Sequence, residues 1–328
     1  MALDILKPQI SRVTKSTNNL IITTYGLGGL GKTPVATKMD KPCYLAFGKS
    51  GLDGLNNVPF FSIKSWSDFK SFNKSLCNKK DCEAIHEMYQ TIILDEMEIL
   101  WKYCEQYVCQ INGVTKIKEA NSGYGAWKDL ADEWETEILR LIGSGFCVMF
   151  ILHAAPDENG RMFPVGDVKR MLPIILNHSA IIGYVKGNGV NPETGRPIHS
   201  SLMLAGTEDY FARTRNEYFD PEIEDYTAEN LVKAYYDALD RQEKEEGIKP
   251  ITLEEKEEMY AAEEIDFDAL MNEIQEYGGK LAEAKGVEIL TDIVENVLGA
   301  GKKAMDLTKK QAQAAKVILS DIKSALNE

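Results

Sequence analysis

The chain has 328 residues, of which 44% are hydrophobic and 27% charged, and this ordinary globular composition excludes a mainly disordered, collagen-like or coiled-coil polymer. Its longest apolar runs, at residues 146–152 and 179–185, are far shorter than the roughly 20 residues that a membrane-spanning helix needs, and we expect no membrane contact and a cytoplasmic location. Because the formal net charge is −14, the surface as a whole repels DNA, RNA and anionic lipid, so any contact with nucleic acid must be a local basic patch.

Alternating strand and helix patterns run through the first two thirds of the chain. Residues 19–25 are apolar and β-branched, and they lead through a glycine-rich loop into a helix that we expect to end near Met39. Further strands are predicted at residues 43–47, 60–63, 91–95, 146–153, 179–185 and 201–205, with helices at 66–76, 97–108 and 124–142. This alternation predicts an α/β fold with a mainly parallel sheet and helices on both faces.

The composition changes near residue 239, which we take as the end of a core domain at 1–239. Residues 240–264 are rich in charge and are predicted to be a linker or solvated helices. Residues 265–328 carry apolar side chains at helical spacing, in segments 267–277, 287–298 and 304–326. The sequence therefore predicts an α-helical appendage after the core.

The glycine-rich loop, GLGGLGKT, matches the phosphate-binding pattern G-x-x-x-x-G-K-[ST] in full. Glycines let consecutive backbone N–H groups turn toward a triphosphate at the positive end of the following helix. Lys32 is expected to reach the β- and γ-phosphates, and the Thr33 hydroxyl is expected to ligate Mg²⁺. The predicted nucleotide-binding residues are Gly26, Gly28, Gly29, Leu30, Gly31, Lys32, Thr33 and Pro34.

Two adjacent acids follow the strand TIILD. Asp95 closes that strand and is the carboxylate expected to hold the water shell of the metal. Glu96 comes next and has two interpretations. It is either the base that orients the attacking water, or a carboxylate favoured by the dipole at a helix N-terminus.

A third strand, FCVMFILH, ends in His153. A polar residue at the tip of an apolar strand is placed to sense the γ-phosphate and to pass its presence to the loop that follows. The alternative is a histidine that is merely hydrogen-bonded at a strand end.

The loop predicted at residues 154–170 mixes cations with apolar side chains. Its candidate DNA-binding residues are Arg161, Phe163, Lys169 and Arg170, because base-stacking and phosphate-pairing groups together suit a single strand. Long loops also collect charge and proline without any such function, so composition leaves both interpretations open.

Two arginines, Arg213 and Arg215, stand in the stretch FARTRN. Either they reach a γ-phosphate on a neighbouring subunit and stabilise charge there, or they are surface charges that pair with nearby acids.

The chain resembles the RecA-like ATPases encoded by phages in the order of its motifs. These are the P-loop, TIILDE, the helix containing GYGAWKDL, FILH, the basic loop and FARTRN. These AAA-type nucleotide-binding proteins include the Sak-four type of single-strand annealing recombinases, and the resemblance covers residues 19–235. It implies a RecA-like P-loop NTPase core, with ATP held by residues 26–33, Mg²⁺ linked to Asp95, a switch at His153 and a DNA-facing loop at 154–170. It also implies that Arg213 and Arg215 form a basic finger at a subunit interface.

The resemblance further implies single-stranded-DNA-dependent ATPase activity and assembly into rings or filaments. It implies work beside single-strand-binding protein in recombination or replication. One position departs from the family, because Lys49 follows the second strand where a catalytic glutamate is expected. Either Glu96 acts as the base, or hydrolysis is slow and the protein works mainly as an ATP-gated binder.

Two kinds of function follow from these residues. The first is an Mg²⁺–ATP-dependent, single-stranded-DNA-binding enzyme, which the pair Asp95 and Glu96 favours. The second is a nucleotide-gated oligomeric scaffold with little turnover, which Lys49 favours. A helicase or helicase loader shares the same core motifs and is a third possibility.

Overall fold

The computed structural model describes residues 8, 10–48, 51–77, 82–260 and 266–327. It divides the chain into two compact units, of which the larger is Arg12–Lys256 and the smaller contains the described residues from Glu257 onward. Lys49, where the resemblance leads us to expect an acid, lies outside the described residues.

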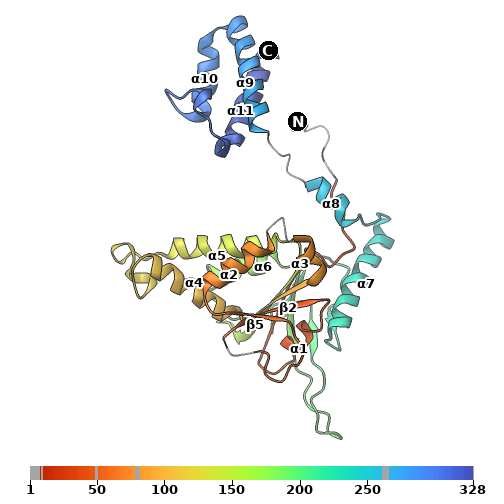
Figure 1. Ribbon diagram of the computed structural model, residues 1–328. Helices are drawn as coiled ribbons and strands as arrows, with labels where there is room; N and C mark the ends of the chain where they lie inside the picture. The colour runs from red at the N-terminus through yellow and green to blue at the C-terminus, as the bar shows by residue number, and fades with distance from the viewer. Residues whose placement is uncertain (1–7, 9, 49–50, 78–81, 261–265, 328) are drawn as a thin grey trace. The chain divides into compact units, whose positions relative to one another are not determined.

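A single large sheet forms the centre of the larger unit (Figure 1). Its strands follow the order β10-β8-β7-β1-β5-β4-β2-β3, with β6 paired to β5 and β9 paired to β7. The strands from β7 to β3 in this order are parallel, while β6, β8, β9 and β10 join antiparallel. The α/β prediction with a mainly parallel sheet is confirmed. The strand bounds are Ile21–Gly26 (β1), Pro42–Phe47 (β2), Phe60–Ile63 (β3), Thr91–Asp95 (β4), Cys147–Pro156 (β5), Met162–Pro164 (β6), Ile181–Lys186 (β7), Ser201–Met203 (β8), Arg213–Thr214 (β9) and Glu222–Ile223 (β10).

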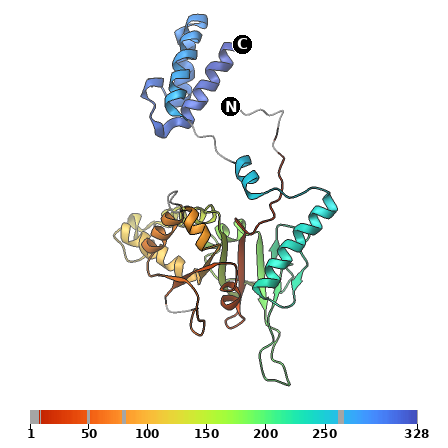
Figure 2. The same ribbon diagram turned by 45° about the vertical axis from the view of Figure 1, so that its right-hand side comes forward.

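Helices cover both faces of this sheet (Figure 1; Figure 2). Strand residues alternate between two apolar cores because successive side chains point to opposite faces. In β4, for example, Ile92 and Leu94 pack with the helices α2, α4, α5 and α6, whereas Ile93 packs with α1 and α7. The helix bounds in the larger unit are Lys32–Ala36 (α1), Trp66–Leu76 (α2), Cys82–Met88 (α3), Met97–Ile111 (α4), Trp127–Ile142 (α5), Met171–His178 (α6) and Ala228–Glu246 (α7), and a further helix, Leu253–Tyr260 (α8), spans the boundary between the two units.

Three local predictions in the larger unit differ from the structure. The helix after the glycine-rich loop ends at Ala36 rather than near Met39, because Lys38 and Met39 donate their backbone N–H groups to carbonyls only three residues back, within tight turns. The helix predicted at 124–142 begins at Trp127, after two short 3-10 turns. The expected loop at 154–170 contains a β-hairpin, because β5 continues to Pro156 and pairs with β6.

Helix α7 crosses residue 239, where the composition changes, and ends at Glu246, before Gly247 in a left-handed conformation with φ of 70°. Residues beyond it remain attached to the larger unit, because the Ile251 N–H donates to the Val13 carbonyl at 2.9 Å. The charged segment 240–264 therefore contributes the end of α7, a bridge to the chain's N-terminal part, and α8, while 261–265 lie outside the described residues.

The smaller unit is helical and has an apolar core of its own, centred on Ile274, Leu281, Ala315 and Ile318. The helix predicted at 304–326 begins at Ala312, because two 3-10 turns with their own capping bonds occupy 304–306 and 309–311. Its helices are Phe267–Lys285 (α9), Val287–Leu298 (α10) and Ala312–Asn327 (α11). Among the residues that the structure describes, no helix has the length and apolar character needed to cross a lipid bilayer.

Candidate active site at the carboxyl edge of the sheet

The strand order brings three motifs to one edge of the sheet. Strand β5 lies between β1, which precedes the glycine-rich loop, and β4, which ends in Asp95. In the pairing of β1 with β5, Gly26 and His153 are register partners. Ligands of open α/β sheets bind beyond the carboxyl ends of the strands, so the first glycine of the loop, His153 and Asp95 face the same space.

Three glycines of the loop have conformational or steric reasons to be glycine. Gly29 and Gly31 have φ of 77° and 84°, which side chains other than glycine rarely adopt. A Cβ on Gly26 would lie 2.8 Å from the Val185 carbonyl oxygen in β7. Leu30 faces the core formed with α1 and α7, and its carbonyl accepts a hydrogen bond from the Ser200 hydroxyl at 3.0 Å. Pro34 is exposed in the first turn of α1.

Lys32 is buried beneath this loop, with 6% of its surface exposed. Its Nζ donates to the carbonyl oxygens of Gly26 and Leu27, both at 2.8 Å. Burial lowers the pKa of Lys32, while the carboxylates of Asp95, Glu98 and Glu96 oppose that shift. The ammonium group is therefore held inside the loop by weak acceptors, ready to exchange them for phosphate oxygens.

Thr33 and Asp95 form the second pair of the site. The Thr33 hydroxyl donates to Oδ2 of Asp95 at 2.5 Å, and the Tyr44 hydroxyl donates to the same oxygen at 3.0 Å. Hydroxyl and carboxylate oxygens are the donors that Mg²⁺ prefers, so this pair fits a magnesium ion. Burial and the neighbouring Asp95 carboxylate raise the pKa of the Tyr44 phenol.

Tyr44 was not predicted as a site residue, because it lies in the middle of the apolar strand β2 and carries no motif. The described residue Gly51 shows that the chain after β2 returns over this pair. A Cβ there would meet the Tyr44 hydroxyl and would lie 3.3 Å from Oδ2 of Asp95.

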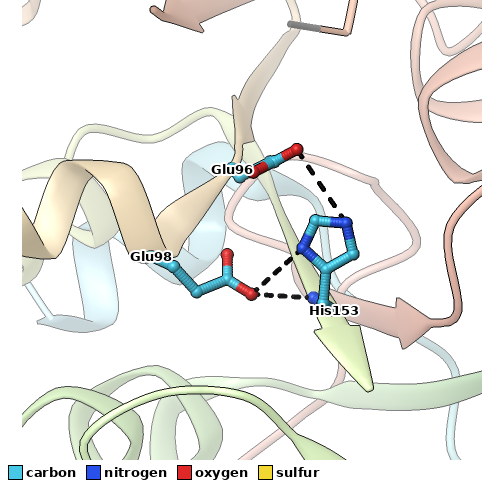
Figure 3. Close-up of side chains that lie close together, drawn as sticks. All are labelled: Glu96, Glu98 and His153. Atoms are coloured by element: carbon cyan, nitrogen blue, oxygen red, sulfur yellow. Dashed lines mark hydrogen bonds and ion pairs between the residues drawn. The ribbon is translucent and has the colours of Figure 1, made fainter. Parts of the chain in front are cut away.

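Glu96, Glu98 and His153 gather next to this pair, with one ligand atom of each within 4.8 Å of the others (Figure 3). His153 Nε2 lies 3.9 Å from Oε1 of Glu96, and its Nδ1 lies 3.4 Å from Oε1 of Glu98. Burial raises the pKa of Glu96, and the carboxylates of Asp95 and Glu98 add to this, while His153 and Lys32 lower it. A carboxylate with a raised pKa is a better proton acceptor than an ordinary one.

The candidate DNA-binding residues lie on or beside the β5–β6 hairpin, and three of the four have partners within the chain. The Arg161 guanidinium donates to the Tyr210 carbonyl at 3.2 Å, and its central carbon lies 5.5 Å from the centre of the Phe211 ring. Phe163 packs on that same ring, with centroids 5.1 Å apart.

Arg170 donates to Asp167 at 3.1 Å and stacks on Trp127, 4.6 Å from the ring centre. Lys169 is the exposed member of the four. The hairpin is also joined to the strand before the glycine-rich loop, because the Tyr25 hydroxyl donates to the Met162 carbonyl at 3.0 Å.

A groove of about 520 Å³ lies between the hairpin and α6. Its lining is largely apolar and includes Phe163, Leu172 and Leu176, with Asp157 and Glu158 as acidic members. The lining includes no residue of the glycine-rich loop, so this groove is separate from the candidate nucleotide site.

Arg213 and Arg215 donate to the end of α6 rather than to nearby acids. Arg213 donates to the Leu176 carbonyl at 2.7 Å, and Arg215 donates to the Asn177 carbonyl. Cations stabilise the exposed carbonyls at a helix C-terminus, which gives both arginines a local structural role. The structure therefore brings Lys32, Thr33, Asp95, Glu96 and His153 together but places the two arginines elsewhere in the same chain.

Comparison with known proteins finds similarity to a protein family and to a prophage-derived protein. Residues 18–216, more than half of the chain, match a protein family described as AAA domain. The chain is also similar to the SPbeta prophage-derived uncharacterized protein YorG of Bacillus subtilis (strain 168), with 46% identity over 328 residues and full coverage of both chains. The family match spans the glycine-rich loop, the acids after β4, His153, the hairpin and both arginines, and it ends before α7.

Proposed function

The chain belongs to the AAA domain family of P-loop ATPases, and from that premise we propose that it is an ATP-hydrolysing, single-stranded-DNA-binding enzyme of a phage. In this proposal the enzyme acts in recombination, single-strand annealing or replication of phage DNA. One observation carries the enzymatic half of this proposal. The Thr33–Asp95 pair, Lys32 and Glu96 share one edge of the sheet, which is the set of groups that phosphoryl transfer to water needs.

Each residue has a separate task in this proposal. Thr33 and Asp95 would hold Mg²⁺, which would supply positive charge against the phosphates. Lys32 exchanges its bonds to the loop carbonyls for bonds to the β- and γ-phosphates. Glu96 accepts a hydrogen bond from the attacking water and aligns it with the γ-phosphorus. His153, opposite Gly26 in the sheet, contacts the γ-phosphate end of the nucleotide.

The DNA-binding half is supported by the position and composition of the hairpin. His153 ends the apolar part of β5, and the β5–β6 hairpin begins with the next residues. A movement of His153 at the nucleotide site would therefore reach the hairpin before any other segment. The hairpin combines Phe163 with cations, which suits base stacking and phosphate pairing. The sharpest test is Lys169→Ala, because Lys169 is exposed and its loss leaves the packing intact.

Titration of fluorescent single-stranded oligonucleotide at several salt concentrations measures this effect. Lys169→Ala is expected to weaken binding and to reduce the dependence of log K on log salt by about 0.7, the value for one phosphate contact on a single strand. Lys118→Ala, which removes an exposed lysine from the connection between α4 and α5, is the matched control. Equal behaviour of the two variants would refute a DNA contact at Lys169.

The resemblance to RecA-like proteins supports further parts of the proposal, which are a ring or filament of identical subunits and cooperation with single-strand-binding protein. In such an assembly Arg213 and Arg215 would leave the end of α6 and act on the nucleotide of a neighbouring subunit. Mixing the Lys32→Ala and Arg215→Ala proteins tests this. Activity in the mixture above that of either variant is expected, since one mixed interface contains both an intact loop and an intact arginine.

The test of the whole proposal is steady-state ATP hydrolysis with Mg²⁺, with no DNA, with single-stranded oligonucleotide and with duplex. Stimulation by single strands that is lost in Lys32→Ala and Glu96→Gln is expected. Stimulation that survives in Glu96→Gln would remove Glu96 from the role of base. ATP binding without turnover under all conditions would instead favour a nucleotide-gated scaffold, the alternative that Lys49 supports from the sequence.

A further inference from the structure

Glu98 has contacts that no motif predicts. It lies in the first turn of α4, and its Oε1 accepts a hydrogen bond from the backbone N–H of His153 at 2.9 Å. The same oxygen lies 3.4 Å from Nδ1 of the His153 ring. One carboxylate oxygen therefore bonds the backbone N–H of this histidine and lies close to Nδ1 of its ring (Figure 3).

The other oxygen of Glu98 shows that this contact is not made for stability alone. Oε2 is buried and has no hydrogen-bond partner among the described residues, and only 17% of the side chain is exposed. A buried carboxylate with an unpaired oxygen costs free energy. The backbone hydrogen bond alone does not account for this burial, and the Nδ1 atom of His153 is the second group that the carboxylate faces.

From this geometry we infer that Glu98 is a positioning residue, which keeps a proton on Nδ1 of His153 and leaves Nε2 as a hydrogen-bond acceptor on the side of Glu96. A carboxylate beside one ring nitrogen sets the tautomer and orientation of a histidine in this way. The inference deepens the proposed ATPase function and rests on it for its kinetic consequence.

The carbonyl group of His153 is held as firmly as its N–H. It accepts a hydrogen bond from the Val165 N–H at 2.9 Å, at the end of the β5–β6 hairpin. The backbone of His153 is thus fixed between α4 on one side and the hairpin on the other. A displacement of the hairpin by bound single-stranded DNA would move the His153 ring relative to Glu96. DNA binding would in this way affect the proposed base directly.

The state of the His153 ring is measurable without turnover. The chain has four histidines, so long-range ¹H–¹⁵N spectra of protein labelled at histidine are simple, and His153→Gln assigns the signal. In the unchanged protein Nδ1 is expected to carry a proton. Glu98→Ala is expected to move that proton to Nε2, while Glu98→Gln, which keeps an acceptor oxygen, restores the original form. Glu105→Ala, on the same helix, is the control.

Kinetics supply the second readout. Glu98→Ala is expected to lower kcat by about tenfold or more while KM for ATP changes less than about threefold, and Glu98→Gln is expected to recover most of the rate. A fall in kcat without a change in the ring would overturn the inference, as would a changed ring with an unchanged kcat. If the unchanged protein hydrolyses no ATP, the proposed function fails, and the spectra still decide whether Glu98 sets the state of His153.

Discussion

Replacement of Lys32 by alanine separates binding of the nucleotide from stability of the fold. The Lys32 ammonium makes two hydrogen bonds to loop carbonyls at 2.8 Å, so at least two of its N–H groups can be exchanged onto phosphate oxygens. Hydrogen bonds that involve a charged group contribute about 1.5–3 kcal/mol each, so two of them amount to about 3–6 kcal/mol. Since 1.4 kcal/mol is a factor of ten, Lys32→Ala is expected to weaken ATP binding by roughly 10² to 10⁴-fold.

The same substitution is expected to leave the free energy of unfolding within about 1 kcal/mol of its original value. The lost bonds to two carbonyls are offset because the buried ammonium, whose pKa is lowered by desolvation, no longer has to be taken out of water. The assay is titration with a fluorescent ATP analogue and Mg²⁺, together with thermal unfolding followed by circular dichroism. Lys38→Ala, which removes an exposed lysine just beyond α1, is the control.

A dissociation constant for Lys32→Ala within threefold of that of the unchanged protein would refute the assignment of the loop. A large loss of thermal stability would refute the second half of the reasoning, because Lys32 would then be part of the packing. Both outcomes are read from the same pair of measurements.

Three further substitutions have defined expectations. Gly26→Ala is expected to lower the free energy of unfolding by about 1–3 kcal/mol, because its Cβ would lie 2.8 Å from the Val185 carbonyl oxygen, whereas a Cβ on Gly28 meets nothing within 4 Å and Gly28→Ala should be near neutral in denaturant titrations. Glu96→Gln is expected to raise the melting temperature at pH 7, and the gain should shrink as pH falls toward 4.5. The reason is that a raised pKa means the folded state holds the proton more tightly, so the carboxylate reduces stability as pH rises through that window. Trp134→Ala is expected to cost about 3–5 kcal/mol in the same titrations, since this fully buried ring stacks in the core and donates to a backbone carbonyl at 3.2 Å.

The predictable parts of the fold are those that show a pattern in consecutive residues of the sequence. Strands buried on both faces appear as continuous apolar runs, as in TIILD and FCVMFILH, and the structure confirms both as central strands. The glycine-rich loop was recognisable because its glycines and Lys32 must stand at fixed spacing. The acids and His153 followed from their positions at the ends of predicted strands.

The rest depends on contacts between segments far apart in the chain. Tyr44 donates to Asp95 only because β2 lies beside β4, and no local pattern distinguishes it from the other apolar residues of its strand. Glu98 looks like an ordinary acid in the first turn of a helix. The extension of β5 into a hairpin depends on β6, which is three residues long and carries no alternation.

The strand order also determines when the nucleotide site forms during synthesis of the chain. Both neighbours of β1 come from much later in the sequence, since Ile21 pairs with Val148 in β5 and Ile22 pairs with Ile181 in β7. Pairings over such long separations form slowly, because closing the long intervening segment costs conformational entropy before any contact offsets that cost. A nascent chain that has left the ribosome only as far as β4 contains the whole glycine-rich loop and Asp95, yet β1 has no partner on either side. We therefore expect ATP to bind only to the finished core and to add its stabilisation after the last of these strands is in place.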